Sequence, residues 1–413
     1  MHTLRIILVL MLIGTATVAA QGQEELRLGG AIQLALKQNP TVLAARSEVD
    51  AADANVRGAR ALANPEVVIT PSVIGESGSD TELLAVQPLE VSGRRQIRTR
   101  IASSEAQATR ARVQVIEREI IRDVKQAYWA IAEAQAVVEL NQANVALAES
   151  LYDASKRQVD VGVVAGSQAI KAQVELARAR QDMITAEVEL VKARIALNTL
   201  LGRRPDTEFT FADTLMFTPV TEAPNRFRAI AAANRPELAE AQALLAVRRQ
   251  EIQAAIALRR PDLAVQARQE TFGGEGGLGI GLTFPLFDWG SIREGKKQAQ
   301  AFARAQEKRV EATRNAVDLE VESALLDVRR TEEQVRQYEG GLLSQSEQLA
   351  EMAQKGYRAG ATGYLEVLEA QRTLKNVRTL YFQTLADHQR SVAQLEWAVG
   401  TELTDVSSQG VTP

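Results

Sequence analysis

The chain has 413 residues, of which 46% are apolar, 24% charged and 4% aromatic, and its formal net charge is −4. It has no cysteine and only two histidines, which excludes disulfides and thiol nucleophiles and leaves almost no means of building a zinc or copper site. The charge is spread along the chain and no nucleophile–base–acid set stands out, so we expect no nucleic-acid partner, no cofactor, no catalytic or metal-binding residues and no enzymatic activity.

The N-terminus has the features of an export signal. Arg5 precedes an apolar stretch from Ile6 to Ile13, which small residues continue as far as Ala20. We therefore predict a signal peptide over residues 1–20. A membrane anchor is the alternative, but the apolar stretch is shorter than the ~20 residues that a spanning helix needs. With no cysteine in the chain, a lipid anchor is not expected.

The remainder of the chain is written twice. Asn39-Pro40 corresponds to Arg235-Pro236, 196 residues later. Gly202 ends the first copy and Gly400 ends the second, 198 residues later. Each copy reads as a short helical part, two β-like runs, a very long helix and a medium helix. A unit of this size is too long for a solenoid repeat, so we expect two halves of one body. The predicted parts are a first structural repeat over 21–202, a linker over 203–225, a second repeat over 226–402 and a flexible tail over 403–413.

The β-like runs predict one hairpin per repeat, at about 66–90 and about 262–287. In the second, large side chains alternate with small or polar ones, at Leu278, Ile280, Leu282, Phe284 and Leu286. Such runs suit transmembrane β-strands, which must close into a barrel because an open edge in lipid leaves backbone groups unpaired. Four strands are fewer than the roughly eight of the smallest known barrels, so several copies of the chain must share one barrel. The alternative is two soluble hairpins packed on helices.

Gly274, Gly276 and Gly279 also fit the dinucleotide-binding pattern. That pattern should open a helix, whereas a proline-containing strand follows here. Glycines at a hairpin tip and on its crowded inner face explain the run better.

Basic residues follow each hairpin, at Arg94, Arg95, Arg98 and Arg100 and again at Arg293, Lys296 and Lys297. Cations at the start of a helix oppose its dipole, so something is expected to compensate for them. Lipid phosphates at the inner rim of a membrane would do so, and solvated helix faces are the alternative.

Two long helical stretches come next. Sixty-eight residues without Gly or Pro separate Gly93 from Gly162, and 44 separate Gly295 from Gly340. We predict a long helix pair over 94–201 and helices over 290–399. Apolar residues step by three and four along them, for example at Ile120, Val124, Ala127 and Ile131 and at Ile184, Val188, Val191 and Ile195. This is the 3.5-residue period of a coiled-coil seam. A second stripe, which includes Leu176 and Leu197, favours a multi-helix cylinder over a simple two-helix hairpin.

The duplicated order of elements resembles the TolC family of trimeric outer-membrane efflux ducts over essentially all of residues 24–402. The segment Gln87-Pro88-Leu89-Glu90-Val91-Ser92-Gly93-Arg94-Arg95 is similar to the CzcC-type branch, which exports heavy-metal cations. The resemblance implies a mainly α fold with β: a duplicated TolC-like fold with a long α-helical coiled-coil barrel. Its four transmembrane β-strands per chain would complete a 12-stranded barrel in a homotrimer.

The same resemblance implies a function, a place and partners. The chain would be the outer-membrane channel component of a tripartite efflux system, a passive duct that reaches into the periplasm and exports substrates, heavy-metal cations by branch. Its partners would be a periplasmic adaptor (membrane fusion) protein, an inner-membrane RND-type pump and outer-membrane lipid. The alternative is a soluble periplasmic coiled-coil adaptor or scaffold protein.

Glu366 and Glu369 are the predicted channel gate. They follow a glycine-bearing turn at 360–363 as the acidic pair of TolC follows its own, and the resemblance implies that they ring the periplasmic entrance. Their i,i+3 spacing puts both carboxylates on one helix face. Threefold symmetry would gather six carboxylates around one axis, and such a ring attracts cations. The alternative is two ordinary solvated glutamates. The first repeat has Gln168 and Lys171 at these positions, so any acidic ring would come from the second repeat alone.

The turns that end the long helices are the predicted tips of the tunnel. The resemblance implies that they dock the adaptor, through Gly162, Gly166, Ser167, Gly360 and Gly363. Glycines there also simply reverse a helical hairpin. His388 falls on a helix seam, where packing or an inter-helix hydrogen bond is expected rather than metal ligation.

Overall fold

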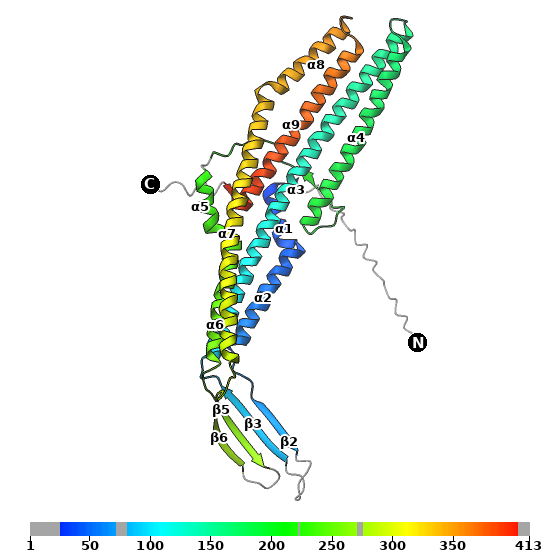
Figure 1. The fold of residues 1–413 in the computed structure, drawn as a ribbon. Coiled ribbons are helices and arrows are strands. Elements are labelled where there is room, and N and C mark those ends of the chain that lie inside the picture. Colours follow the sequence, from blue (N-terminus) through cyan, green and yellow to red (C-terminus); the bar gives the residue numbers. More distant parts are fainter. Residues whose placement is uncertain (1–24, 72–80, 222–223, 271–275, 404–413) are drawn as a thin grey trace, which may run out of the picture.

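The computed structural model describes residues 25–71, 81–221, 224–270 and 276–403. The molecule is elongated, with a β-sheet at one end and two helical hairpins at the other (Figure 1). Helices running roughly along the long axis join the two ends. The predicted fold class, mainly α with β, is confirmed. None of the helices over the described residues combines the length and the apolarity needed to cross a bilayer.

Each repeat begins with a pair of helices broken at a proline. These are α1 (Leu28–Gln38) and α2 (Pro40–Arg60) in the first repeat and α5 (Pro224–Asn234) and α6 (Pro236–Ala257) in the second. Pro40 and Pro236 stand at the first helical position, where the missing N–H has no intrahelical partner to lose. The Asn39 side chain caps α2 by accepting a hydrogen bond from the Thr41 N–H at 2.8 Å.

The sheet holds four antiparallel strands in the order β2-β3-β5-β6. They are β2 (Glu66–Pro71), β3 (Thr81–Leu89), β5 (Asp262–Glu270) and β6 (Gly276–Thr283). The pairing of β3 with β5 joins the two repeats. The register places large apolar side chains together on one face, which we call the outer face: Val67, Ile69, Leu83, Leu89, Leu263, Val265, Leu278, Ile280 and Leu282. The opposite face carries glycines on β6 and an ion pair between Arg268 and Glu82 at 2.7 Å.

The second hairpin is shorter than predicted. β6 ends at Thr283, so the expected extension of the strand through residues 284–287 is wrong. Pro285 has no N–H to donate to a ladder, and this limits continuation of the strand. Gly276 and Gly279 lie within β6, and so the glycine pattern sits on a strand and not at a helix start. Gly274, the first glycine of that pattern, and Ile74 of the first hairpin lie outside the described residues.

The long helices differ between the repeats. In the first, α3 (Arg94–Asp160) runs unbroken for 67 residues, about 100 Å, and α4 (Gly166–Leu200) returns beside it. In the second, α7 (Ser291–Gln337) passes through a π-helical turn, η1 (Tyr338–Leu342), into α8 (Leu343–Arg358), and α9 (Tyr364–Val399) returns. Within η1, Gly341 has a φ of 154°, a conformation that essentially only glycine adopts.

The coiled-coil seams are only partly buried within one chain. On α3, Ile120, Val124 and Ile131 are buried as expected. On α4 the predicted seam residue Asn198 is buried, but the other buried residues lie mostly on a different face: Ala172, Leu176, Ala179, Ala186 and Leu197. The apolar seam residues of α4 are exposed instead: Ile170, Val174, Ile184, Val188, Val191 and Ile195. This helix therefore presents an apolar stripe that its own chain does not cover.

Each repeat has its own hydrophobic core. The first is built on Val42, Tyr128, Ile131, Leu197 and Leu201, and the second on Phe227, Val321, Val328, Leu395 and Val399. A glycine closes each repeat by close backbone contact. A Cβ on Gly202 would lie 2.4 Å from the carbonyl oxygen of Gln38, and one on Gly400 would lie 2.9 Å from that of Asn234.

The segment between the repeats crosses the middle of the molecule. β4 (Thr210–Phe211) pairs in parallel with β1 (Glu25–Leu26). Later in the same segment, the Thr218 carbonyl oxygen lies 3.0 Å from Nε2 of His388 on α9. His388 is fully buried, and its Nδ1 lies 3.2 Å from the Thr331 hydroxyl of α7. The expected inter-helix hydrogen bond of His388 is thus present.

Candidate functional site

The candidate site lies at the end of the molecule formed by the α3–α4 and α8–α9 hairpins (Figure 1). Both hairpins turn in the same way. Gly162 has φ 75° and Gly360 has φ 72°, and the N–H of each donates to the carbonyl three residues earlier, Val159 at 2.9 Å and Tyr357 at 3.1 Å. The following N–H donates back across five residues in each turn. This is the Schellman motif, which uses the positive φ of glycine to end a helix.

The predicted tip residues all lie on these turns and are exposed. Gly162 and Gly360 end α3 and α8, while Gly166 and Ser167 begin α4 and Gly363 precedes α9. Two large apolar side chains of the first turn, Val161 and Val163, are also exposed.

Glu366 and Glu369 lie on the first turns of α9, and both are exposed. Tyr364, Val367 and Ala370 of the same turns are buried, so the helix turns its packed face toward its own chain and its carboxylates away. Neither carboxylate has an ion-pair partner among the described residues. The structure therefore brings the two glutamates together on one open face, as their spacing predicts.

A tyrosine ties the two hairpins together near the turns. The Tyr357 hydroxyl of α8 donates to the Gln158 side-chain oxygen of α3 at 3.0 Å and accepts from the Gln168 amide of α4 at 2.8 Å. Gln168 occupies the position that corresponds to Glu366 in the repeat. The first repeat thus uses this position for an internal contact and the second leaves it free.

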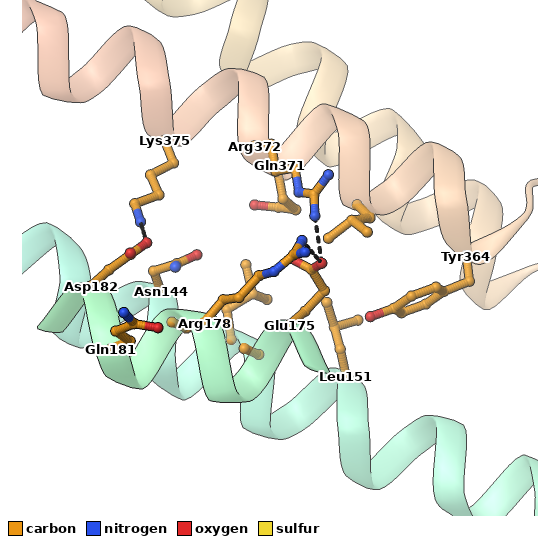
Figure 2. A pocket seen from close by; sticks show the side chains of 14 residues that line it. Asn144, Leu151, Glu175, Arg178, Gln181, Asp182, Tyr364, Gln371, Arg372 and Lys375 are labelled. Atoms are coloured by element: carbon orange, nitrogen blue, oxygen red, sulfur yellow. Dashed lines mark hydrogen bonds and ion pairs between the residues drawn. The ribbon is translucent and has the colours of Figure 1, made fainter. Parts of the chain in front are cut away.

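Ion pairs fasten α9 to α4 farther from the turns, as Figure 2 shows. The Arg372 guanidinium pairs with Glu175, and the Lys375 ammonium lies 2.5 Å from the Asp182 carboxylate. Glu175 also accepts from Arg178 at 2.9 Å. These groups line a cavity of about 380 Å³ between α3, α4 and α9.

Sequence reasoning missed Arg372 and Lys375. The available signal was the placement of two basic residues three and six positions after Glu369, but their partners lie in the other repeat.

Tyr364 borders the same cavity. Burial raises the pKa of its hydroxyl, and the negative charge of Glu175 adds to the effect. The group therefore stays protonated and neutral at physiological pH, which suits a position between packed helices.

The arrangement offers exposed charge and two exposed turns. Within the described ranges, no group of three or more His, Cys, Asp or Glu side chains is placed to hold a metal ion. What the tip presents is a pair of unpaired carboxylates beside two exposed turns.

Comparison with known proteins adds a family. A model of the outer membrane efflux protein family matches residues 31–203 and again 229–401. The chain is similar to the cobalt-zinc-cadmium resistance protein CzcC of Cupriavidus metallidurans, with 27% identity over 91% of this chain and 90% of that protein. It is 25% identical to the toluene efflux pump outer membrane protein TtgF of Pseudomonas putida, over 83% of this chain and 74% of that protein. Its fold is similar to that of the outer membrane protein VceC of Vibrio cholerae, with a TM-score of 0.77 and 19% identity over 91% and 96% of the two chains.

Proposed function

The chain belongs to the outer membrane efflux protein family, and we propose that it exports heavy-metal cations from the periplasm to the exterior as a homotrimer. It is an outer-membrane efflux channel that extends into the periplasm, and it is not an enzyme. A soluble adaptor or scaffold, the alternative from the sequence, does not fit this family.

The trimer is supported by the two sheet edges that a single chain leaves without a partner strand. The sheet has two edge strands, β2 and β6, and an apolar outer face. In lipid such edges require partners, and three copies of four strands make a closed 12-stranded barrel of ordinary size.

The exposed helix stripes support the same assembly. The apolar stripe of α4 needs a cover, and a second set of exposed apolar residues comprises Leu342 at the end of η1 and Leu349 and Met352 on α8. Their spacing of three and seven is that of a coiled-coil face, which suits packing between copies.

The gate proposal rests on Glu366 and Glu369. Both carboxylates are exposed and unpaired among the described residues, and both point away from the core of their own chain. Threefold symmetry gathers six of them at the tip. A ring of this charge concentrates cations at the entrance and repels anions.

The proposed cargo, heavy-metal cations, is supported by the acidic ring together with the name of one relative. The protein from Cupriavidus metallidurans is named for cobalt, zinc and cadmium resistance, whereas the one from Pseudomonas putida is named for toluene. Of these two cargoes, an acidic entrance without a fixed metal site suits cations in transit.

The partners are a periplasmic adaptor protein and an inner-membrane RND-type pump. The adaptor docks on the exposed turns at Gly162, Gly166 and Ser167 and at Gly360 and Gly363. Residues 1–20 direct export, and residues 203–225 link the repeats, which span 21–202 and 226–402. The two separate matches of the family model, at 31–203 and 229–401, support this division.

Conductance in planar bilayers tests the duct and its gate. Wild-type protein is expected to conduct cations in preference to anions, and Glu366→Gln with Glu369→Gln to reduce that preference. Glu187→Gln, on an exposed site of α4, is the matched control and should change nothing. Absence of any conductance, even in the doubly neutralised variant, would contradict the proposed channel function. Unchanged ion selectivity in that variant would remove the gate only.

Sensitivity of a deletion strain tests the cargo. The strain is expected to become sensitive to cobalt, zinc or cadmium salts and to be rescued by the wild-type chain. Sensitivity to organic toxicants alone would replace metal cations with apolar substrates.

A further inference from the structure

The turn between β6 and α7 holds a strained tryptophan. Trp289 has a φ of 46°, and it is the one non-glycine residue with a positive φ over the described ranges. With Gly290 at φ 89° it forms the centre of a tight turn, in which the Ser291 N–H donates to the Asp288 carbonyl at 2.7 Å. Positive φ at both central positions is a type I′ turn, for which Asn, Asp or Gly is preferred at the first position. Tryptophan is among the least suitable residues here.

The Asp288 side chain stabilises the turn by accepting from the Gly290 N–H at 3.1 Å, but among the described residues the Trp289 ring itself is barely packed. The Trp289 side chain is 95% exposed. Its ring centroid lies 6.2 Å from that of Phe287, which is itself 74% exposed. Strain of this kind clusters at functional sites, which makes the exposed indole a candidate for contact with a partner outside the chain.

The position of Trp289 identifies its surroundings. Leu278, Ile280 and Leu282 lie on the outer face of β6, and the exposed apolar run continues through Leu286 to Phe287. The eight residues of β6 span about 26 Å, close to the height of the apolar band of a membrane barrel. Trp289 lies between β6 and the start of α7, and therefore at the border of that band. Figure 1 shows the sheet joining the helices at this end of α6 and α7.

Cations surround the same turn. Arg259 lies 3.7 Å from the Asp288 carboxylate, and Arg293 and Lys297 share Glu294 at 3.1 and 2.8 Å. Lys296 is exposed and has no ion pair among the described residues. Positive charges thus exceed negative ones, and those on the first turns of α7 oppose its dipole. An anion supplied from outside would relieve this repulsion.

We propose that Phe287, Trp289, Arg259, Arg293 and Lys296 form an anchor surface that binds anionic phospholipid headgroups of the periplasmic leaflet. The indole lies at the boundary between acyl chains and headgroups, as tryptophans do at membrane interfaces. The guanidinium and ammonium groups bind lipid phosphate through charge-assisted hydrogen bonds. The assignment rests on the outer-membrane channel described above, and it fixes the depth at which the barrel sits.

Depth-dependent quenching tests the position of the indole. The full-length chain is reconstituted in phosphatidylcholine bilayers that contain phosphatidylglycerol, and its fluorescence is compared with that of Trp289→Phe. The chain has three tryptophans, so the difference isolates Trp289. Lipids brominated near the headgroup are expected to quench the Trp289 fluorescence more than lipids brominated near the end of the acyl chain. Aqueous iodide is expected to quench it less in bilayers than in detergent. Equal iodide quenching in both media overturns the proposal, and so does quenching by neither agent, which places the indole against a second copy.

Phospholipid binding tests the charges. In mixed micelles the affinity for phosphatidylglycerol is expected to fall about fivefold for each of Arg293→Gln and Lys296→Gln. Lys308→Gln, on an exposed site farther along α7, is the control and should change it far less. An equal effect of Lys308→Gln means that only overall charge matters, which overturns the site.

Trp289→Asn separates anchoring from folding. Asparagine suits the turn, so the thermal midpoint in detergent is expected to hold or rise. A lower midpoint identifies Trp289 as a packing residue and contradicts the proposal. Conductance measured on the same preparations distinguishes failure of the anchor proposal from failure of the channel proposal. A wild-type protein that conducts no ions would contradict the channel function, whereas the quenching result would still test the anchor.

Discussion

The side-chain amide of Asn39 donates a hydrogen bond to the backbone carbonyl of Leu200, 2.8 Å away. The second repeat makes the same contact with a different residue, because Arg235 Nη1 donates to the carbonyl of Ala398 at 3.0 Å. In each case the residue before a helix-starting proline holds the end of the last helix of its repeat. The duplication has kept the contact and changed its chemistry.

Arg235→Ala is expected to destabilise the protein strongly. The guanidinium is 2% exposed, pairs with Glu237 and Glu320 at 2.8 and 2.6 Å, and lies 4.3 Å from the Trp397 ring centroid. Removing it leaves partly buried carboxylates without their partner and takes a hydrogen bond from the Ala398 carbonyl, a loss of about 3 kcal/mol in the free energy of unfolding. Urea denaturation followed by circular dichroism measures it. Arg204→Ala, on an exposed pair with Asp206, should leave the midpoint in place. Similar midpoints for both variants would contradict the assigned role.

Three glycine-to-alanine changes are expected to rank by geometry. Gly202→Ala combines a φ of 69° with a Cβ 2.4 Å from the Gln38 carbonyl oxygen, which should cost roughly 3 kcal/mol or more. Gly162→Ala has a φ of 75° but no heavy atom within 4 Å of its Cβ, so only the backbone cost of about 1 kcal/mol remains. Gly295→Ala lies inside α7 with open space around it and should stabilise by up to about 1 kcal/mol. Thermal melting orders the three, and equal losses for Gly202→Ala and Gly162→Ala would refute the close-contact argument.

The exposed stripe of α4 gives a prediction about assembly. Ile184→Glu or Val191→Glu places a charge on a face that our proposal buries between copies, so the trimer is expected to dissociate. Thr185→Glu adds the same charge about 100° around the same helix and serves as the matched control. Native mass spectrometry in detergent counts the copies. Trimers that survive Ile184→Glu would show that this stripe lies outside the interface.

Stability should fall in alkali through Tyr381. Burial, then the hydrogen bond to Glu339 at 2.9 Å and its negative charge, raise the pKa of Tyr381 to about 12. The folded state therefore holds this proton more tightly than the unfolded chain, whose tyrosine pKa is about 10. The contribution to stability is complete below pH of about 10 and is lost as pH rises toward about 12.

Phenolate absorbance and melting points recorded across this range test the prediction. Tyr381→Phe should flatten the fall in melting temperature, and Glu339→Gln should move the titration toward the ordinary value. A Tyr381 titration centred near pH 10 would overturn the assignment.

Local sequence signals predicted the elements well, and contacts between distant residues set the limits. Residues 364–399 form α9 as expected, because Gly363 and Gly400 flank a run without Gly or Pro. The π-helical turn at Tyr338–Leu342 was not predicted, since adjacent glycines ordinarily end a helix. Here the chain continues through them, and the Tyr338 ring lies 6.0 Å from that of Tyr381 on another helix.

The same limit applies to the candidate site. The shared face of Glu366 and Glu369 follows from their spacing alone. The pairing of Glu175 with Arg372 joins residues 197 positions apart, and no local pattern announces it. The outward stripe of α4 was recognised as a seam but not as an external one, because a single sequence does not distinguish contacts within a copy from contacts between copies.

The unpartnered margins of the sheet, at β2 and β6, have a consequence for biogenesis. A solitary polypeptide that entered hydrocarbon would carry two rows of amides with nothing to bond, at a cost of several kcal/mol for each group. Insertion and oligomerisation are therefore expected to be a single event. Unassembled monomers would remain in the aqueous compartment, where chaperones bind them or proteases degrade them.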